Sequence, residues 1–283
     1  MKVRKSFIAA AALGVAAVVT LSTVAGCGSS GSGNTEEKLS GKVSVSGSTT
    51  VLPLASEAAS RFMDAHPDVT VDVQGGGSSV GITQVSQGAV DIGTSSRDLK
   101  PEEQSLGLVD TKIAYDVITV IVNPGVKVTN LTKDQVKGIF TGAITNWQQV
   151  GGENTPIAVV VRDKASGTRE MFDEKALDKA EPVTSAMETN SNGIMRDTVA
   201  STRNAIGYIS LGYLTSAVKS VQFNGVDATK ENALAKKYPL ARYLHMLTKG
   251  EAQGVAEFYI DFVASSQFQN EVVSKEYIPL TQL

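Results

Sequence analysis

Cysteine and histidine are scarce in this sequence. It contains one cysteine, Cys27, and two histidines, His66 and His245, among 283 residues. A lone cysteine leaves no partner for a disulfide, and neither histidine has the neighbours expected of a catalytic base, since one precedes a proline and the other is flanked by apolar residues. The spacing of His, Cys and carboxylates that metal sites use is also missing. We therefore expect no disulfide, no catalytic histidine, no metal and no other cofactor.

Excess positive charge is absent as well. The chain has 26 Lys and Arg against 29 Asp and Glu, a net charge of −3, and removal of residues 1–26 with their three cations would make it −6. An acidic body argues against nucleic acid as a partner. An anionic ligand would have to be held by local donors and one or two arginines, against the overall field.

The amino terminus has the pattern of a secretory signal. Three cations precede an uncharged run from Phe7 to Gly26 that is rich in Ala, Val and Leu. Val24-Ala25-Gly26 before Cys27 resembles a bacterial lipobox, which predicts a signal peptide over 1–26 and a lipidated Cys27. An ordinary signal peptide or an uncleaved anchor are the alternatives. Residues 27–40 are small and polar, so we expect a flexible linker and attachment to the membrane by lipid only.

Three strand-like segments each run into a loop rich in Ser, Thr and Gly. These pairs are Lys42 to Val45 with Ser46 to Thr50, Val69 to Val73 with Gly75 to Ser79, and Ala89 to Gly93 with Thr94 to Asp98. Helical spacing follows the first two loops. In an open α/β sheet the carboxyl ends of the strands are where ligands bind. The glycine loop does not fit a dinucleotide fingerprint, because the third glycine would fall at Val80, and it lacks the Gly-Lys-Ser of a P-loop.

A fourth strand-loop-helix segment carries an arginine. Between a strand over 157–161 and a helix over 170–177, the sequence places Arg162, Ser166, Gly167 and Thr168. Serine suits a helix cap, glycine permits unusual backbone angles, and the free amides of a helix start attract anions. Alone, the segment is an ordinary turn whose arginine could form a surface ion pair. Together with the upstream loops it predicts a site for a tetrahedral oxyanion.

Later segments add elements but no further site. Thr132 and Gln135 have the spacing of a capping box, and Trp147 is predicted to be a packing residue. Asn192 is predicted to cap a helix that ends near residue 200. A helix over 253–264 is predicted to bury four apolar side chains: Val255, Phe258, Phe262 and Val263.

Four motifs in order resemble the phosphate-binding lipoproteins of phosphate ABC importers. They are Ser46-Gly-Ser-Thr-Thr50, Gly75-Gly-Gly-Ser-Ser-Val-Gly81, Asp91-Ile-Gly-Thr-Ser-Ser96 and Arg162-x-x-x-Ser166-Gly-Thr168. The resemblance implies an α/β, type II periplasmic-binding-protein fold, with a ligand cleft between two lobes joined by two crossover strands. We expect the first lobe to comprise 41–118 and 213–283, and the second 119–212. The partners implied are inorganic phosphate, the permease subunits and through them the ATPase, with the binding protein itself a monomer.

The resemblance also implies which residues hold the anion. The first lobe would contribute Ser48, Thr49, Thr50, Ser78 and Ser96, and the second would contribute Arg162, Ser166, Gly167 and Thr168. The guanidinium of Arg162 would make the charge-assisted contact. Because the two groups belong to different lobes, anion binding and closure should be one event.

One position departs from the family pattern. Well-known members place an aspartate where this chain has Ser96, and that carboxylate accepts the proton of hydrogen phosphate and helps to exclude sulfate. Here a hydroxyl stands in its place, with Asp91 or Asp98 as nearby acceptors, while Arg97 is expected to pair with an acid. Sulfate, molybdate or tungstate are therefore alternative ligands, and a phosphatase or a surface adhesin are alternative functions.

Overall fold

The computed structural model describes residues 38–283. The predicted signal peptide (1–26), the lipidation site at Cys27 and the linker up to residue 37 lie outside the described residues. Within 38–283, no helix combines the length and the apolar character needed to cross a bilayer.

Ten strands form a mixed, curled sheet in the described part of the chain. They are β1 (Gly41–Gly47), β2 (Val69–Gly75), β3 (Ile92–Ser95), β4 (Leu108–Val122), β5 (Asn130–Leu131), β6 (Ala158–Arg162), β7 (Met187–Thr189), β8 (Ala205–Ser210), β9 (Lys219–Phe223) and β10 (Ala241–Lys249).

Helices flank this sheet. The α-helices are α1 (Leu52–Ala65), α2 (Ser78–Ser86), α3 (Lys133–Phe140), α4 (Gly167–Leu177), α5 (Asn192–Ser201), α6 (Lys230–Leu234), α7 (Val255–Ala264), α8 (Ser266–Phe268) and α9 (Ser274–Glu276). The shorter 3₁₀ and π turns are η1 (Gln104–Leu106), η2 (Trp147–Val150), η3 (Leu211–Tyr213), η4 (Gln269–Val273) and η5 (Leu280–Gln282).

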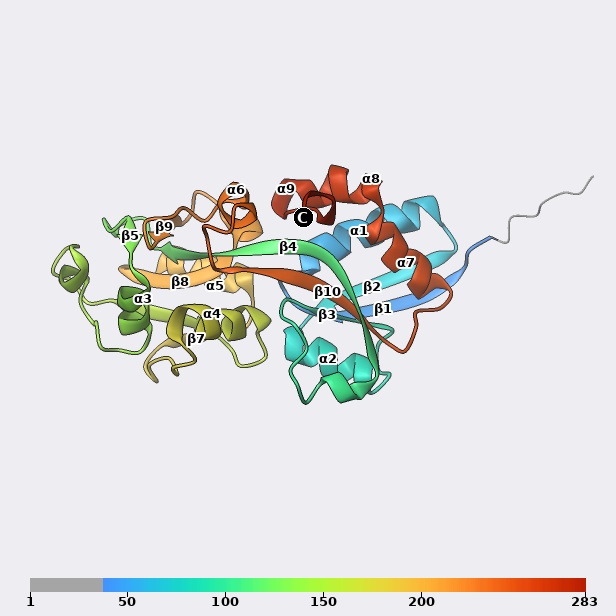
Figure 1. Ribbon diagram of the computed structural model, residues 1–283, viewed down its shortest axis with the longest axis horizontal. Coiled ribbons are helices and arrows are strands. Elements are labelled where there is room, and N and C mark those ends of the chain that lie inside the picture. The colour runs from blue at the N-terminus through green and yellow to red at the C-terminus, as the bar shows by residue number, and fades with distance from the viewer. Residues whose placement is uncertain (1–37) are drawn as a thin grey trace, which may run out of the picture. The chain divides into compact units, whose positions relative to one another are not determined.

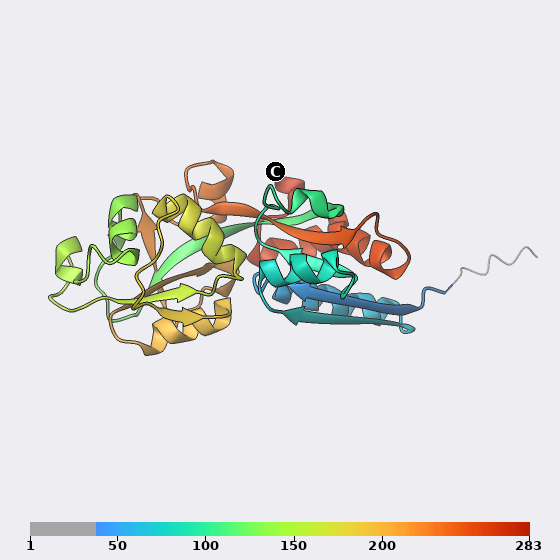
Figure 2. The same ribbon diagram turned by 90° about the horizontal axis from the view of Figure 1, so that it is seen from below.

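Two long strands join two lobes. The strand order is β2-β1-β3-β10-β4-β8-β6-β7, with β9 pairing to β4 and β5. Strands β4 and β10 are antiparallel neighbours and lie side by side through the middle of the described chain (Figure 1). The first part of β4 pairs with β10, whereas its last five residues pair with β8. Figure 2 shows the same two groups of elements from below.

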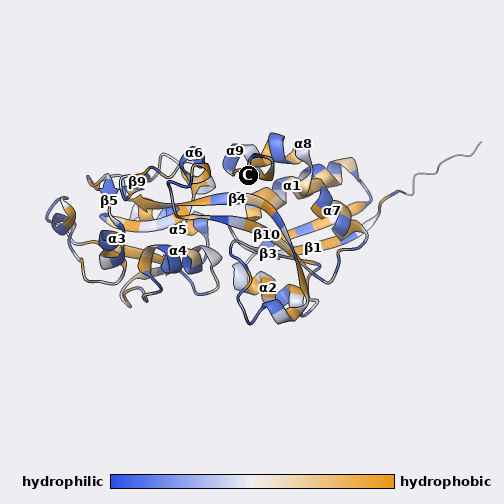
Figure 3. Cartoon of the chain, in the orientation of Figure 1, coloured by the Kyte–Doolittle hydropathy of each residue, from blue (hydrophilic) through white to orange (hydrophobic). Residues whose placement is uncertain are grey.

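Each lobe has its own hydrophobic core. One core is built from residues between Val43 and Ala114 and between Leu244 and Tyr277, and the other chiefly from residues between Val117 and Leu240. Strands such as β4 carry many hydrophobic residues, whereas α4 is mostly hydrophilic (Figure 3). Strands and helices pack against one another within each lobe, because each lobe removes its own apolar area from water.

The chain returns from the second lobe to the first at a later residue than the sequence predicts. Residues 213–240 were expected in the first lobe, yet Val218, Val221 and Tyr238 belong to the core of the second. The reason is pairing, because β9 adds to β4 within the second lobe. We therefore place the lobe boundaries near residues 117 and 240.

Most predicted elements occur with shifted ends. The capping box of Thr132 and Gln135 is present at α3, and Trp147 is buried. Helix α7 forms as expected, but Phe258 is 55% exposed, so its predicted burial is wrong. Val263 is buried as predicted, and Val255 and Phe262 are half-buried against the same core. Tyr259 is buried in place of Phe258, because the helix presents a slightly different stripe to the core.

Candidate anion-binding site

The three loops of the first lobe end at one edge of the sheet. Strands β1, β2 and β3 are parallel, with β1 in the centre, so their carboxyl ends coincide. The loops are tied together by the backbone, since Ser48 N donates to Thr94 O and Gly77 N donates to Gly47 O. Gly47 has φ of 137°, and a Cβ there would lie 2.3 Å from Thr94 O. Only glycine fits this turn, so the loop must begin where it does.

The hydroxyl groups of these loops have two kinds of role. Ser48 Oγ accepts the amide N–H of Thr50 at 3.2 Å, which shapes the turn before α1. Ser78 Oγ accepts the amide of Ser96 at 3.0 Å and lies 3.2 Å from Ser96 Oγ. Ser78 is also the first residue of α2. These residues are buried, as is Thr49.

Helix α4 of the second lobe begins against the loops of the first lobe. Ser166 caps it as predicted, with Oγ accepting the amide of Arg169 at 3.2 Å. The amides of Gly167 and Thr168 come first in the helix and have no partner one turn earlier, which makes this end favourable for an anion. A Cβ on Gly167 would lie 2.3 Å from Ser78 Oγ and 2.9 Å from Ser96 Oγ. The helix start therefore reaches the first lobe at close contact.

Arg162 is fixed by its backbone while part of its side chain lacks a partner. Its N–H donates to Tyr208 Oη at 3.1 Å, and its carbonyl accepts from Arg169 Nη1 at 2.8 Å. The side chain is 1% exposed; Nη2 donates to Thr49 Oγ1 and Asn190 O, but Nε and Nη1 have no hydrogen-bond partner within 38–283. Burial lowers the pKa of Arg162. A buried guanidinium with unused donors suits an anion that supplies the missing acceptors.

The predicted residues of the two lobes lie against each other. Thr50 Oγ1 is 3.1 Å from Thr168 Oγ1, Arg162 Nη2 is 3.2 Å from Thr49 Oγ1, and Gly167 packs on Ser78. The structure thus brings the nine predicted residues into one cluster, in which Ser48 and Ser166 serve the turn and the helix cap. Their role in ligand binding stays a prediction.

Two further residues belong to this cluster and were missed from the sequence. Arg242 is 3% exposed; its Nη2 donates to Thr50 Oγ1 at 3.2 Å and to Thr168 Oγ1 at 2.9 Å, and its Nη1 has no partner in the described chain. Asn192 Nδ2 donates to Thr49 and Thr50. A signal existed for Arg242, since an arginine in the apolar segment 242–247 is unusual, but no motif marked it.

Asn192 is not the cap of α5, contrary to the sequence prediction. Ser191 caps that helix by accepting the amide of Ile194, and Asn192 is the first helical residue. Its Oδ1 accepts the amide of Ser210 at 3.1 Å, so its amide group is free to point its N–H bonds at the threonines. Asn192 can contact the threonines of the first lobe because the Ser191 side chain already caps α5.

The acids named as possible acceptors do not reach the cluster. Asp91 accepts from the amide and hydroxyl of Ser44, and the Asp98 side chain is 82% exposed. Arg97 pairs with acids, as expected, because its guanidinium contacts Glu103 and Glu170. The carboxylate that does adjoin the cluster is Asp116, which is fully engaged: Oδ2 pairs with Arg242 Nη2 at 2.9 Å, and Oδ1 accepts from Ser210 Oγ at 2.6 Å.

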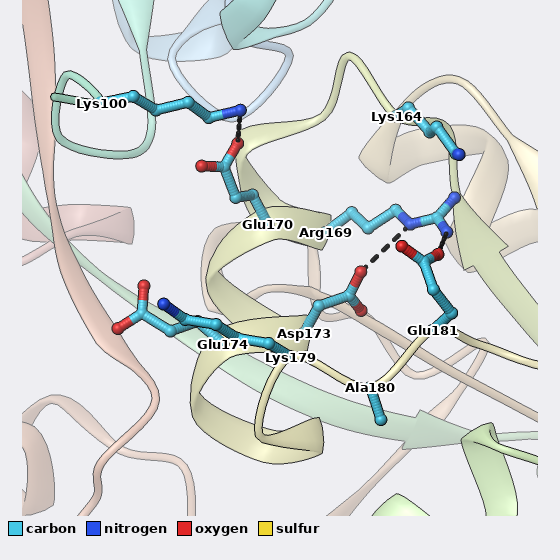
Figure 4. Close-up of a pocket in the computed structure, with 9 residues that line it drawn as sticks. All are labelled: Lys100, Lys164, Arg169, Glu170, Asp173, Glu174, Lys179, Ala180 and Glu181. Atoms are coloured by element: carbon cyan, nitrogen blue, oxygen red, sulfur yellow. Dashed lines mark hydrogen bonds and ion pairs between the residues drawn. The ribbon is translucent and has the colours of Figure 1, made fainter. Parts of the chain in front are cut away.

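A cavity of about 360 Å³ is lined by residues of α4 and of neighbouring segments, and none of the nine predicted residues lines it. Figure 4 shows its charged lining, with Lys100 joined to Glu170 and Arg169 joined to Asp173 and Glu181. Cations and carboxylates alternate there, so no single sign of charge dominates. The buried cluster, not this cavity, has the donors that an oxyanion needs.

The chain is similar to known proteins over most of its length. Residues 32–267 match the family model of the PBP superfamily domain. The phosphate-binding protein PstS of Bacillus subtilis is 40% identical over 273 residues, covering 92% of this chain and 90% of that protein. PstS of Borreliella burgdorferi is 34% identical over 249 residues, covering 83% and 89%.

A solved structure is similar across the described chain. A protein from Clostridium perfringens, described as a phosphate ABC transporter substrate-binding protein with bound phosphate, superposes with a TM-score of 0.82. It is 39% identical and is covered completely, over 85% of this chain. The fold and the buried donors thus define a two-lobed solute-binding protein of the periplasmic-binding-protein class. Within that class, the chain belongs to the PstS family of phosphate-binding proteins.

Proposed function

We propose that this protein captures inorganic phosphate between its lobes and delivers it to an ABC importer. The observation that carries the proposal is the convergence of two buried arginines, each with unused N–H donors, on hydroxyls and helix starts from both lobes. On binding, the hydroxyls that now contact one another would exchange these contacts for phosphate oxygens. The PstS relatives support phosphate as the anion.

The available contacts are sufficient for tight binding. A micromolar dissociation constant corresponds to about 8 kcal/mol, and a hydrogen bond to a charged group contributes roughly 1.5–3 kcal/mol. A few such bonds exceed this requirement, which leaves room for the cost of association.

The acceptor for the phosphate proton would be a hydroxyl oxygen. Ser96 replaces the family aspartate, and Asp116 is occupied by Arg242 and Ser210. A hydroxyl can either donate or accept, so it excludes sulfate less strictly than a carboxylate does. Phosphate should bind more tightly than sulfate, but sulfate should compete measurably.

Isothermal titration of phosphate and of sulfate at several pH values tests the proposal. One phosphate per chain, with sulfate weaker, is expected; molybdate and tungstate serve as comparison anions. No heat and no thermal stabilisation by phosphate would favour an adhesin that merely keeps the fold. Turnover of a chromogenic phosphate ester would instead favour a phosphatase.

We also infer the setting in which the protein works. Export by the signal over 1–26, followed by lipidation of Cys27, would hold an extracytoplasmic monomer at the membrane beside its permease. The permease and its ATPase are the partners that the family implies.

A further inference from the structure

An ion pair joins the two crossover strands beside the cluster. Asp116 on β4 and Arg242 on β10 are direct partners in the register of this strand pair. Asp116 Oδ2 accepts from Arg242 Nε at 3.1 Å and from Nη2 at 2.9 Å. Both side chains are 1% exposed, so the pair is closed off from water.

The contacts of this pair extend to both lobes. Arg242 Nη2 also donates to Thr50 Oγ1 of the first lobe and to Thr168 Oγ1 of the second. Asp116 Oδ1 accepts from Ser210 Oγ, at the end of β8 in the second lobe. The guanidinium therefore has a fixed orientation: two nitrogens are held by Asp116, and Nη1 is the donor without a partner in the described chain.

We propose that Asp116 is a positioning residue that strengthens phosphate binding by holding Arg242 in register with the hydroxyls of both lobes. This inference rests on the proposed function. It runs against simple electrostatics, since a carboxylate beside an anion site lowers the affinity through its charge. The two effects have opposite signs, so a charge-neutral replacement distinguishes them.

The test is isothermal titration of phosphate into Asp116→Asn at a temperature where thermal unfolding shows the variant to be folded. Asparagine keeps the size but gives Arg242 one neutral acceptor, so we expect the dissociation constant to rise at least tenfold with the stoichiometry unchanged. An unchanged or tighter dissociation constant would overturn the inference. A loss confined to the melting temperature, with wild-type affinity, would overturn it too.

Two further variants complete the design. Arg242→Lys retains the charge, but an ammonium lacks the planar fork that contacts Asp116 and two threonines together. This variant should therefore also weaken phosphate binding at least tenfold. Wild-type affinity would count against the positioning role, even if Asp116→Asn did not fold. Asp110→Asn is the matched control. Asp110 contacts His245 across the same two strands at 2.8 Å, away from the cluster, and its loss should leave affinity unchanged. Failure of the wild-type chain to bind phosphate would instead refute the proposed function.

Discussion

Arg162 provides a strong test, because its replacement should weaken phosphate binding far more than it changes the stability of the phosphate-free protein. Its Nε and Nη1 are buried without partners, so a bound anion would gain two charge-assisted hydrogen bonds. At roughly 1.5–3 kcal/mol each, their removal costs about 3–6 kcal/mol of binding free energy. Arg162→Met should therefore weaken phosphate binding by about 10²- to 10⁴-fold.

The same substitution should change the stability of the phosphate-free protein little. Methionine loses the bonds from Nη2 to Thr49 and Asn190, but it also removes a buried charge that lies in no salt bridge of the described chain. These terms oppose each other, so we expect a change in unfolding free energy within about 1 kcal/mol.

Thermal unfolding with and without phosphate measures both quantities. At a phosphate concentration 100 times its dissociation constant, the wild-type protein gains about 2.7 kcal/mol, whereas the variant should gain about 0.4 kcal/mol or less. Arg61→Met is the control, because Arg61 is a partly exposed residue of α1 that pairs with Glu57. The reasoning fails if Arg162→Met keeps wild-type affinity, or if it unfolds the phosphate-free protein.

Three other outcomes are expected. Gly167→Ala should abolish tight phosphate binding while each lobe stays folded, because the added Cβ would lie 2.3 Å from Ser78 Oγ. Calorimetry measures the affinity, and circular dichroism checks the fold. Normal affinity would show that the lobes close differently. Burial raises the pKa of the Asp173 carboxyl to about 6 in the folded protein. The folded state therefore binds this proton more tightly than the unfolded chain does. The resulting stabilisation of the folded state is complete below about pH 4 and is lost as the pH rises through 6. Asp173→Asn should thus gain about 1–2 kcal/mol relative to wild type between pH 4 and 7, allowing for partial exposure, in urea unfolding at each pH; a constant difference would contradict it. Cys27→Ala should release the protein from membranes, and continued sedimentation with them would argue against the lipid anchor.

The sequence was most informative where local chemistry dominates. The strand-loop-helix order and the cap at Ser166 follow from interactions within a few residues, and both are present. The side of α7 that is buried was not predictable in the same way. Phe258 is exposed because the orientation of that helix depends on α1, against which it packs.

The cleft itself shows the same limit. The nine residues predicted from the four motifs lie close together, because β1, β2 and β3 end at one edge of the first lobe and the start of α4 in the second lobe lies against their loops. Arg242 and Asn192 were missed since no motif marks either residue as part of an anion site. They reach the cluster only through the pairing of β10 with β4 and the placement of α5 beside β8.

Local sequence patterns are enough to specify an α/β protein with hydroxyl-rich loops and an arginine at strand ends, because short-range hydrogen bonding and hydrophobic periodicity encode such elements. Three features arise only when the whole chain folds: residues 213–240 join the second lobe, Arg242 contacts Thr50 and Thr168, and Asp116 pairs with Arg242. These depend on pairing between strands far apart in the chain, whose free energy comes from contacts that no local segment contains.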